Sequence, residues 1–149
     1  MTSSRIIRPV IQSDFAQWEP LWIAYNKFYE RVLPLEVTEM TWTRFFEDEE
    51  PIFGLVAVEN GQLMGLAHYI FHRSTSMIGN SCYLSDLYTV APARGKGIGR
   101  ALIEAVCEKA KAAGSSRVYW MTQETNSTAM VLYDKVAERS GFIQYRKQL

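Results

Sequence analysis

The stretch LYTVAPARGKGIGRALIEAV, residues 87–106, decides the fold. A short apolar run leads into three alternating glycines, and these lead into a segment with the apolar spacing of a helix. The N-terminus of a helix has unpaired N–H groups and a partial positive charge, so it attracts phosphate. The turn, which carries three basic side chains, consists of Arg94, Gly95, Lys96, Gly97, Ile98, Gly99 and Arg100. The stretch therefore predicts a phosphate-binding turn between a strand and a helix.

Two familiar phosphate-binding patterns do not fit this turn. The dinucleotide pattern requires its third glycine at position 100, which is Arg100. The nucleoside-triphosphate pattern requires Ser or Thr after Gly-Lys, where this chain has Gly97. A tight turn with incidental basic neighbours remains the alternative, because a glycine triplet alone is a weak signal.

The composition indicates one globular domain over residues 1–149. Hydrophobic residues make up 48% and charged residues 21%, which is ordinary for a globular protein. Lys plus Arg equals Asp plus Glu at 16 each, so the overall charge predicts no nucleic-acid or membrane partner. Cys82 and Cys107 are too few for a disulfide framework, and no apolar run reaches the length of a membrane span. We therefore expect a cytoplasmic protein.

Hydrophobic periodicity predicts an α/β domain with a mixed sheet. The Asn-Gly pair at 60–61 is typical of a two-residue hairpin turn, and residues 116–123 are apolar on both faces, which favours a central strand. The predicted elements, in order, are a strand at 4–11, a helix from Ser13-Asp14, a helix at 37–50, a hairpin at 52–71, a strand at 80–90, a helix from Gly97 to Gly114, a strand at 116–123, a helix from Asn126-Ser127 to Gly141 and a strand at 142–149.

Two motifs resemble those of the GCN5-related N-acetyltransferase (GNAT) family. RGKGIG at 94–99 is similar to the family's Arg/Gln-x-x-Gly-x-Gly/Ala turn, and NSTAMVLYDKVAERSGF at 126–142 is similar to its closing motif. The resemblance covers nearly the whole chain, because the order of elements also agrees. The aromatic early helices, ETN at 124–126 and YRK at 145–147 look most like the diamine acetyltransferases and the yeast Hpa-type acetyltransferases. The resemblance implies a single-domain, mostly antiparallel mixed sheet flanked by about four helices. It also implies a V-shaped splay between two central parallel strands.

The resemblance further implies that acetyl-CoA is the cosubstrate and that no metal is used. Its pyrophosphate would lie on the turn at 94–100, and its pantetheine arm between the strands at 82–90 and 116–123. Asn126 would reach the amides of that arm. Backbone groups of the first strand would also bind it, and these belong to Leu87, Tyr88, Thr89 and Val90.

Acetyl transfer to an amine needs an acceptor for the amine's proton, since an alkylammonium group has a pKa of about 10.4. It also needs a proton donor for the departing thiolate. The resemblance implies that Tyr133 is this donor and that it also contacts the cofactor. An aromatic residue on the inward face of an amphipathic helix is otherwise typical of core packing.

Several residues are candidates for the proton acceptor. Ser85 stands where diamine acetyltransferases have a Glu, and serine cannot act as a base unaided. Asp86, its neighbour, is expected on the opposite strand face. Glu124 matches an acidic position of the subfamily but also fits a solvated loop. We expect a water chain that ends at Asp86 or Glu124. His68 and His72 qualify by titration range alone and are more typical of hairpin strands.

The first two helices are expected to shape the acceptor groove. Their aromatic and acidic side chains suit a cationic amine, although aromatic residues at helical spacing are usually core and residues 47–50 fit a solvated helix end. These side chains belong to Trp18, Trp22, Tyr25, Phe28, Tyr29, Glu30, Glu36 and Glu39. A polyamine, an amino acid and a protein lysine all fit.

We therefore favour an N-acetyltransferase acting on a small-molecule primary amine. The alternatives are a protein or histone lysine acetyltransferase and a non-catalytic acyl-CoA-binding sensor. A homodimer formed through the late strands is also expected.

Overall fold

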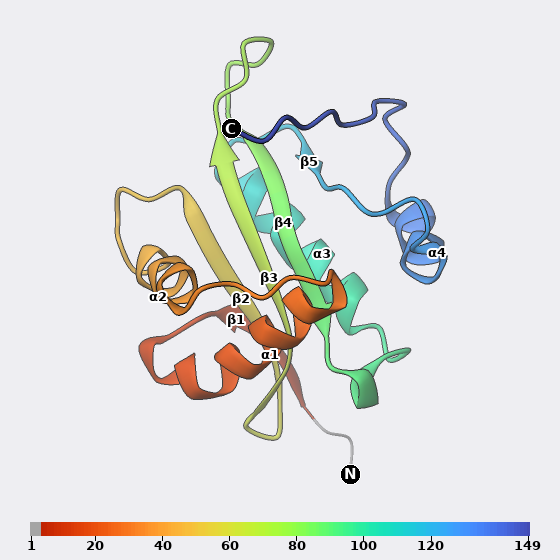
Figure 1. Cartoon of the computed structure of the whole chain (residues 1–149). Coiled ribbons are helices and arrows are strands. Elements are labelled where there is room, and N and C mark those ends of the chain that lie inside the picture. Colours follow the sequence, from red (N-terminus) through yellow and green to blue (C-terminus); the bar gives the residue numbers. More distant parts are fainter. Residues whose placement is uncertain (1–3) are drawn as a thin grey trace.

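The computed structural model describes residues 4–149 and contains one five-stranded sheet in the order β1-β2-β3-β4-β5 (Figure 1). Neighbouring strands from β1 to β4 are antiparallel, and β4 and β5 are parallel. The predicted mixed, mostly antiparallel sheet with one parallel pair is thereby confirmed. The strands are β1 (Arg5–Pro9), β2 (Ile52–Glu59), β3 (Gln62–His72), β4 (Ser81–Thr89) and β5 (Val118–Tyr119).

Helices cover both faces of the sheet. In Figure 1, α1 and α2 lie in front of the strands and α3 lies behind them, while α4 stands beside β5. Among the described residues, no helix has both the length and the apolar character needed to cross a membrane. The α-helices are α1 (Phe15–Phe28), α2 (Leu35–Arg44), α3 (Ile98–Ala112) and α4 (Ser127–Val136), and short 3-10 turns occupy Gln12–Asp14 and Ala91–Ala93.

The alternation of side chains along the strands divides the core into two clusters. Leu55 packs with the α3 face, and the next residue, Val56, packs with the α1 and α2 face. The second cluster also contains Trp18 and Trp22 of α1, both buried. Their burial agrees with the core alternative for the aromatic residues of the first helix.

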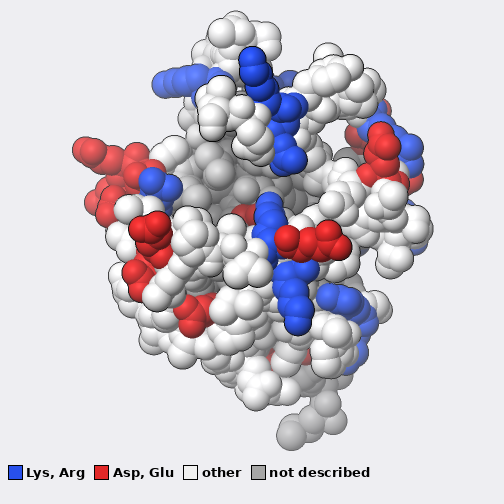
Figure 2. Space-filling model, in the orientation of Figure 1, with Lys and Arg blue, Asp and Glu red and all other residues white. Residues whose placement is uncertain are grey.

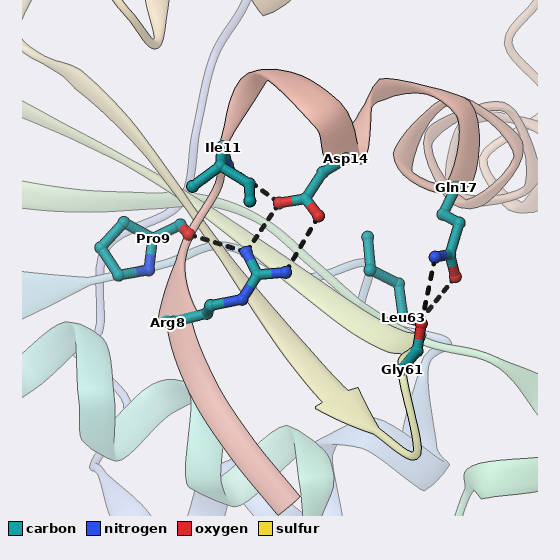
Figure 3. Close-up of polar contacts among 7 residues, drawn as sticks. All are labelled: Arg8, Pro9, Ile11, Asp14, Gln17, Gly61 and Leu63. Carbon is teal, nitrogen blue, oxygen red and sulfur yellow. Dashed lines mark hydrogen bonds and ion pairs between the residues drawn. The ribbon is translucent and has the colours of Figure 1, made fainter.

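Polar side chains fix the first turns of α1 to the sheet (Figure 3). The Arg8 guanidinium in β1 donates to both carboxylate oxygens of Asp14, at 2.7 and 3.0 Å, and this hydrogen bonding lowers the pKa of Asp14. Gln17 spans the end of the hairpin, because its amide donates to the carbonyl of Gly61 at 3.2 Å and accepts from the N–H of Leu63 at 3.0 Å. These contacts position the aromatic residues of α1 over β3 and β4.

Gly65 in β3 allows α3 to pack closely against the end of β4. A Cβ atom at this position would lie 2.8 Å from the carbonyl oxygen of Tyr88 and 3.1 Å from Cγ2 of Ile98, closer than a real side chain tolerates. Since Ile98 opens α3, the missing side chain seats the N-terminus of the helix at the end of β4.

The hairpin turn between β2 and β3 follows the sequence prediction. Asn60 and Gly61 have φ angles of 51° and 76°, the pair of positive values that a two-residue turn of this kind requires.

Four predicted elements differ in the structure. The last helix ends at Val136 and does not reach Gly141, because the backbone of Ala137 is extended. The second helix ends at Arg44 and does not reach residue 50, because the acidic run at 47–50 is unfavourable at the negative end of a helix dipole. The predicted central strand at 116–123 is wrong, since only Val118–Tyr119 pair and β5 lies at the sheet edge. The predicted strand at 142–149 is also wrong: no strand occurs after α4 among the described residues. The β5 ladder ends at Tyr119, which leaves that last segment no neighbour to pair with.

Candidate active site

The glycine turn leaves its backbone amides uncovered. Gly95 and Gly97 adopt left-handed φ angles of 79° and 82°, which glycine reaches without steric cost. The first α3 hydrogen bond joins the N–H of Ala101 to the carbonyl of Gly97 at 3.0 Å. Within the described chain, the amides of residues 95–100 donate no backbone hydrogen bond. A side chain at Gly95 would meet nothing within 4 Å, so these donors face open space.

Arg5 in β1 supports the turn from behind, a role that the sequence analysis missed. Its guanidinium donates to the carbonyl of Lys96 at 2.8 Å and pairs with Glu59 at 3.1 Å. With the carbonyl held on the inner side, the amides of the turn point outward. No local pattern links residues 5 and 96, because they meet only through the sheet.

The predicted basic residues of the turn differ in their contacts. Arg94 donates to the carbonyl of Thr89 at 3.1 Å and lies over the ring of Tyr88, with its guanidinium carbon 5.7 Å from the centroid. Arg100 forms an exposed pair with Glu104 on the next turn of α3. Arg94 is therefore fixed beside the end of β4, where the strand enters the turn.

The edge of β4 that faces β5 is open over most of its length. The two strands pair only at Cys82 and Tyr83, and the chain after β5 then runs away toward α4 (Figure 1). The N–H of Val90 donates to Met64 of β3 at 2.9 Å, so the peptide groups of Thr89, one residue earlier, point to the open edge. Leu87 shares this orientation because it lies two residues before Thr89. This gap is the predicted splay.

A small cavity lies where the splay opens. It joins the end of α1, the middle of β4, the segment after β5 and α4. Its lining residues are Tyr25, Tyr29, Leu84, Ser85, Leu87, Trp120, Met121 and Tyr133. A larger groove of about 530 Å³ lies between β1 and α3, but none of the predicted site residues lines it. Size alone therefore does not mark the site.

A buried chain of hydrogen bonds leads from α1 to Asp86. The indole N–H of Trp18 donates to Nε2 of His68 at 3.0 Å, and Nδ1 of His68 lies 3.0 Å from a carboxylate oxygen of Asp86. An indole nitrogen can only donate, so Nε2 must accept and the imidazole proton must sit on Nδ1. His68 then donates to Asp86 and holds that carboxylate in place. With both ring nitrogens engaged, His68 acts as a support and not as a free base.

A β-bulge explains how Asp86 reaches this position. The register between β3 and β4 shifts so that His68 faces Asp86 while Tyr69 faces Leu84, which leaves Ser85 as the extra residue. The bulge places Asp86 beside His68 on the α1 face of the sheet. The hydroxyl of Tyr25 donates to the carbonyl of Ser85 at 3.4 Å. Burial and, to a smaller extent, the nearby charge of Asp86 raise the pKa of Tyr25.

Tyr133 lines the cavity from α4. Its ring is half-buried and meets Trp120 edge to face, with centroids 5.5 Å apart. Burial, with a smaller effect from Tyr29, raises the pKa of Tyr133 to about 12, so the phenol keeps its proton at neutral pH.

The remaining candidates lie away from this cavity or have other partners. Glu124 is exposed in the segment before α4 and does not line the cavity. Asn126, the N-cap residue of α4, donates to the hydroxyl of Thr122 at 3.2 Å. His72 contacts the hydroxyl of Tyr119 at 2.7 Å and the carbonyl of Arg73 at 2.8 Å, near the end of β3. Tyr133 thus lines the cavity, Asp86 lies next to the lining residues Ser85 and Leu87 and is held by His68, and Glu124 is exposed before α4.

Similarity to known proteins identifies the class of this fold and site. The acetyltransferase (GNAT) family model matches residues 16–137, so the chain belongs to that family and is an N-acetyltransferase. The chain is 36% identical over 150 residues to D-amino-acid N-acetyltransferase HPA3 of Saccharomyces cerevisiae, a match that covers 99% of this chain and 93% of the relative.

Two further matches extend this result. The chain is 30% identical over 141 residues to the uncharacterized N-acetyltransferase YhfO of Bacillus subtilis, covering 93% of this chain and 94% of the relative. Among solved structures, the aminoglycoside N-acetyltransferase AAC(6')-Iy in complex with CoA matches with a TM-score of 0.84. That match covers 100% of this chain and 98% of the other at 16% identity, so it shows the fold alone.

The hydrogen-bond chain predicts the tautomer of His68. At neutral pH, imidazole ¹⁵N–¹H correlation spectra should show a proton on Nδ1 and none on Nε2, because the Trp18 indole donates to Nε2. The chain contains 2 histidines, so His72→Gln assigns the signals and serves as the control. Trp18→Phe, which removes the donor, should introduce the Nε2-protonated form. A protonated Nε2 in the unmodified protein would contradict this arrangement.

Proposed function

We propose that this protein transfers an acetyl group from acetyl-CoA to a primary amine of a small molecule, such as a polyamine or an amino-acid-like compound. The observation that carries the proposal is a positioned carboxylate, Asp86, in the stretch of β4 that lines the cavity, together with a protonated phenol, Tyr133, that lines it from α4. The yeast relative is named for D-amino acids, which supports a small acceptor.

The residues around the glycine turn fit the cofactor. Uncovered amides at residues 95–100, with Arg94 and Lys96 beside them, suit a pyrophosphate. The open edge of β4 at Leu87 and Thr89 offers backbone groups to an extended amide-containing arm, as a neighbouring strand would. When bound, acetyl-CoA supplies the acetyl group as a thioester.

The proton transfers are assigned to two side chains. Asp86, directly or through one water, takes the proton that the amine loses as its nitrogen bonds to the acetyl carbon. His68 holds the carboxylate in position by donating to one of its oxygens. As the carbon–sulfur bond breaks, the hydroxyl of Tyr133 gives its proton to the sulfur. The products are the N-acetylated amine and the free thiol of coenzyme A.

A panel of acceptors tests this function against its two alternatives. Thiol release from acetyl-CoA should be stimulated by small primary amines and not by lysine-containing peptides. Stimulation by peptides alone would favour a protein lysine acetyltransferase. Thermal stabilisation by acetyl-CoA without turnover on any amine or peptide would favour the acyl-CoA-binding sensor, since binding to the folded state alone raises its stability.

The identity of the base is tested by the acidic limb of the pH profile of kcat/KM. Asp86→Asn should lower kcat/KM by about 10²- to 10⁴-fold and change that limb, because the proton acceptor is removed. Glu124→Gln is the matched control and should leave both nearly unchanged, since Glu124 is exposed before α4, whereas Asp86 is held by His68 beside the cavity. Unaltered acidic limbs in both variants would reject the water chain to either carboxylate.

The role of Tyr133 is tested by removing one oxygen atom. Tyr133→Phe keeps the edge-to-face contact with Trp120, so the dissociation constant of acetyl-CoA should stay the same, while kcat should fall by about 10²-fold or more. Tyr69→Phe, in the buried core and not among the residues that line the cavity, controls for the loss of a buried hydroxyl. An unchanged kcat in Tyr133→Phe would remove this residue from the mechanism.

The expected homodimer remains a prediction. The segment after α4 exposes Phe142, Ile143 and Tyr145 to 90%, 70% and 90%, an apolar surface that a second copy would cover.

A further inference from the structure

Arg31 lies beside the cavity, just after α1 ends. Its guanidinium carbon is 5.3 Å from the ring centroid of Tyr29 and 5.7 Å from that of Tyr25. Both rings line the cavity at the splay. The positive charge therefore lies against two of the aromatic rings that line the cavity together with Tyr133.

The guanidinium of Arg31 has no acidic partner among the described residues, in contrast to Arg5 and Arg8, which each hold a carboxylate at 3.1 Å or less. A guanidinium that stacks on an aromatic ring uses its face, and its N–H groups in the plane stay available. Those groups form a fork that matches the two oxygens of a carboxylate.

The backbone at the end of α1 fixes the direction of Arg31. Its N–H donates to the carbonyl of Asn26 at 2.9 Å, and the N–H of Glu30 donates to Lys27 at 2.9 Å, which closes the helix in a Schellman turn. Glu30 occupies the left-handed position of this turn with φ of 57°, where glycine is the usual residue. A non-glycine residue such as Glu30 that keeps a left-handed backbone beside a cavity indicates a segment shaped for function.

We propose that Arg31 binds the carboxylate of the acceptor, so that the preferred acceptor is an amino acid and not a polyamine. This inference rests on the proposed acetyl transfer. An amino acid carries an ammonium and a carboxylate separated by one carbon. Asp86 lies between the lining residues Ser85 and Leu87, and Arg31 lies over the rings of Tyr25 and Tyr29, which also line the cavity. Tyr25 connects the two, with its hydroxyl bonded to the β4 backbone and its ring below the guanidinium.

The charge of Arg31 disfavours a polyamine, which carries positive charges only. Figure 2 shows a hollow in the face that carries α1, with both basic and acidic side chains around it. A second ammonium group that approached Arg31 would be repelled, whereas a carboxylate would be attracted.

The test compares acceptors that differ only in the carboxylate. For each amino acid, in both enantiomers, kcat/KM is measured beside that of its carboxamide and of spermidine, with rates expressed per concentration of unprotonated amine. The unmodified enzyme should prefer the amino acid over its amide by about 10- to 100-fold, the range for a charge-assisted hydrogen-bonded pair. Arg31→Gln should bring this ratio close to one, mainly through KM. Arg31→Lys should give an intermediate ratio, because it keeps the charge and loses the fork.

Arg139→Gln is the matched control. It removes the same unit of charge from an exposed position after α4 and should leave the ratio unchanged. Calorimetric titration of an amino acid into the protein saturated with coenzyme A gives a readout that does not need turnover. Binding there should weaken by the same factor in Arg31→Gln.

The outcomes separate this inference from the proposed function. Amine-dependent thiol release without discrimination between amino acid and amide would overturn the role of Arg31 and leave the acetyl transfer intact. Binding of amino acids that depends on Arg31, without acetylation of any amine, would support the carboxylate site and reject the proposed function. A weaker affinity for coenzyme A itself in Arg31→Gln, equal for all acceptors, would assign Arg31 to the cofactor and overturn the inference.

Discussion

The hydrogen-bond ladder between β4 and β5 ends after two residue pairs, and the site depends on that early end. A longer parallel ladder would consume the backbone groups that β4 directs toward β5. Because β5 stops at Tyr119, the peptide groups around Leu87 and Thr89 have no strand beside them. Unpaired peptide groups at a sheet edge can bind a further extended chain, so this edge suits an extended molecule that carries amides of its own. The same gap admits the side chains of α4 and of the segment after β5 to the middle of the sheet.

One extra residue in β4 links this gap to the chemistry. The bulge at Ser85 interrupts the alternation of side chains, and a bulge also bends its strand and increases the local twist. The changed alternation turns Asp86 toward His68 and α1. The bulge at Ser85 comes soon after Tyr83, the last residue of β4 that pairs with β5, so the carboxylate lies close to where the gap begins.

Features that depend on a few consecutive residues were predictable from the sequence, whereas features that depend on distant partners were not. The hairpin turn at Asn60-Gly61 and the glycine turn before α3 follow from backbone constraints within each segment. The orientation of Asp86 was missed, because a bulge is defined only by the register with β3. The support of His68 by Trp18 was missed too, since these residues are 50 positions apart and both patterns read as core.

The apolar run at 116–123 is a local pattern whose meaning also depends on distant parts of the fold. The pattern predicts a central strand, but Trp120 and Met121 are apolar because they line the cavity at the splay. Apolar side chains on both faces of a segment show that both faces are covered, and a cavity wall covers them as well as two neighbouring strands do.

In the proposed enzyme, the catalytic carboxylate and the side chain that selects the acceptor belong to different parts of the fold. Asp86 is held by the sheet and by a buried hydrogen-bond chain, while Arg31 stands on the segment that follows α1. Chemistry that must be precise is then built on rigid elements, and selection of the acceptor on a segment that can change without disturbing them.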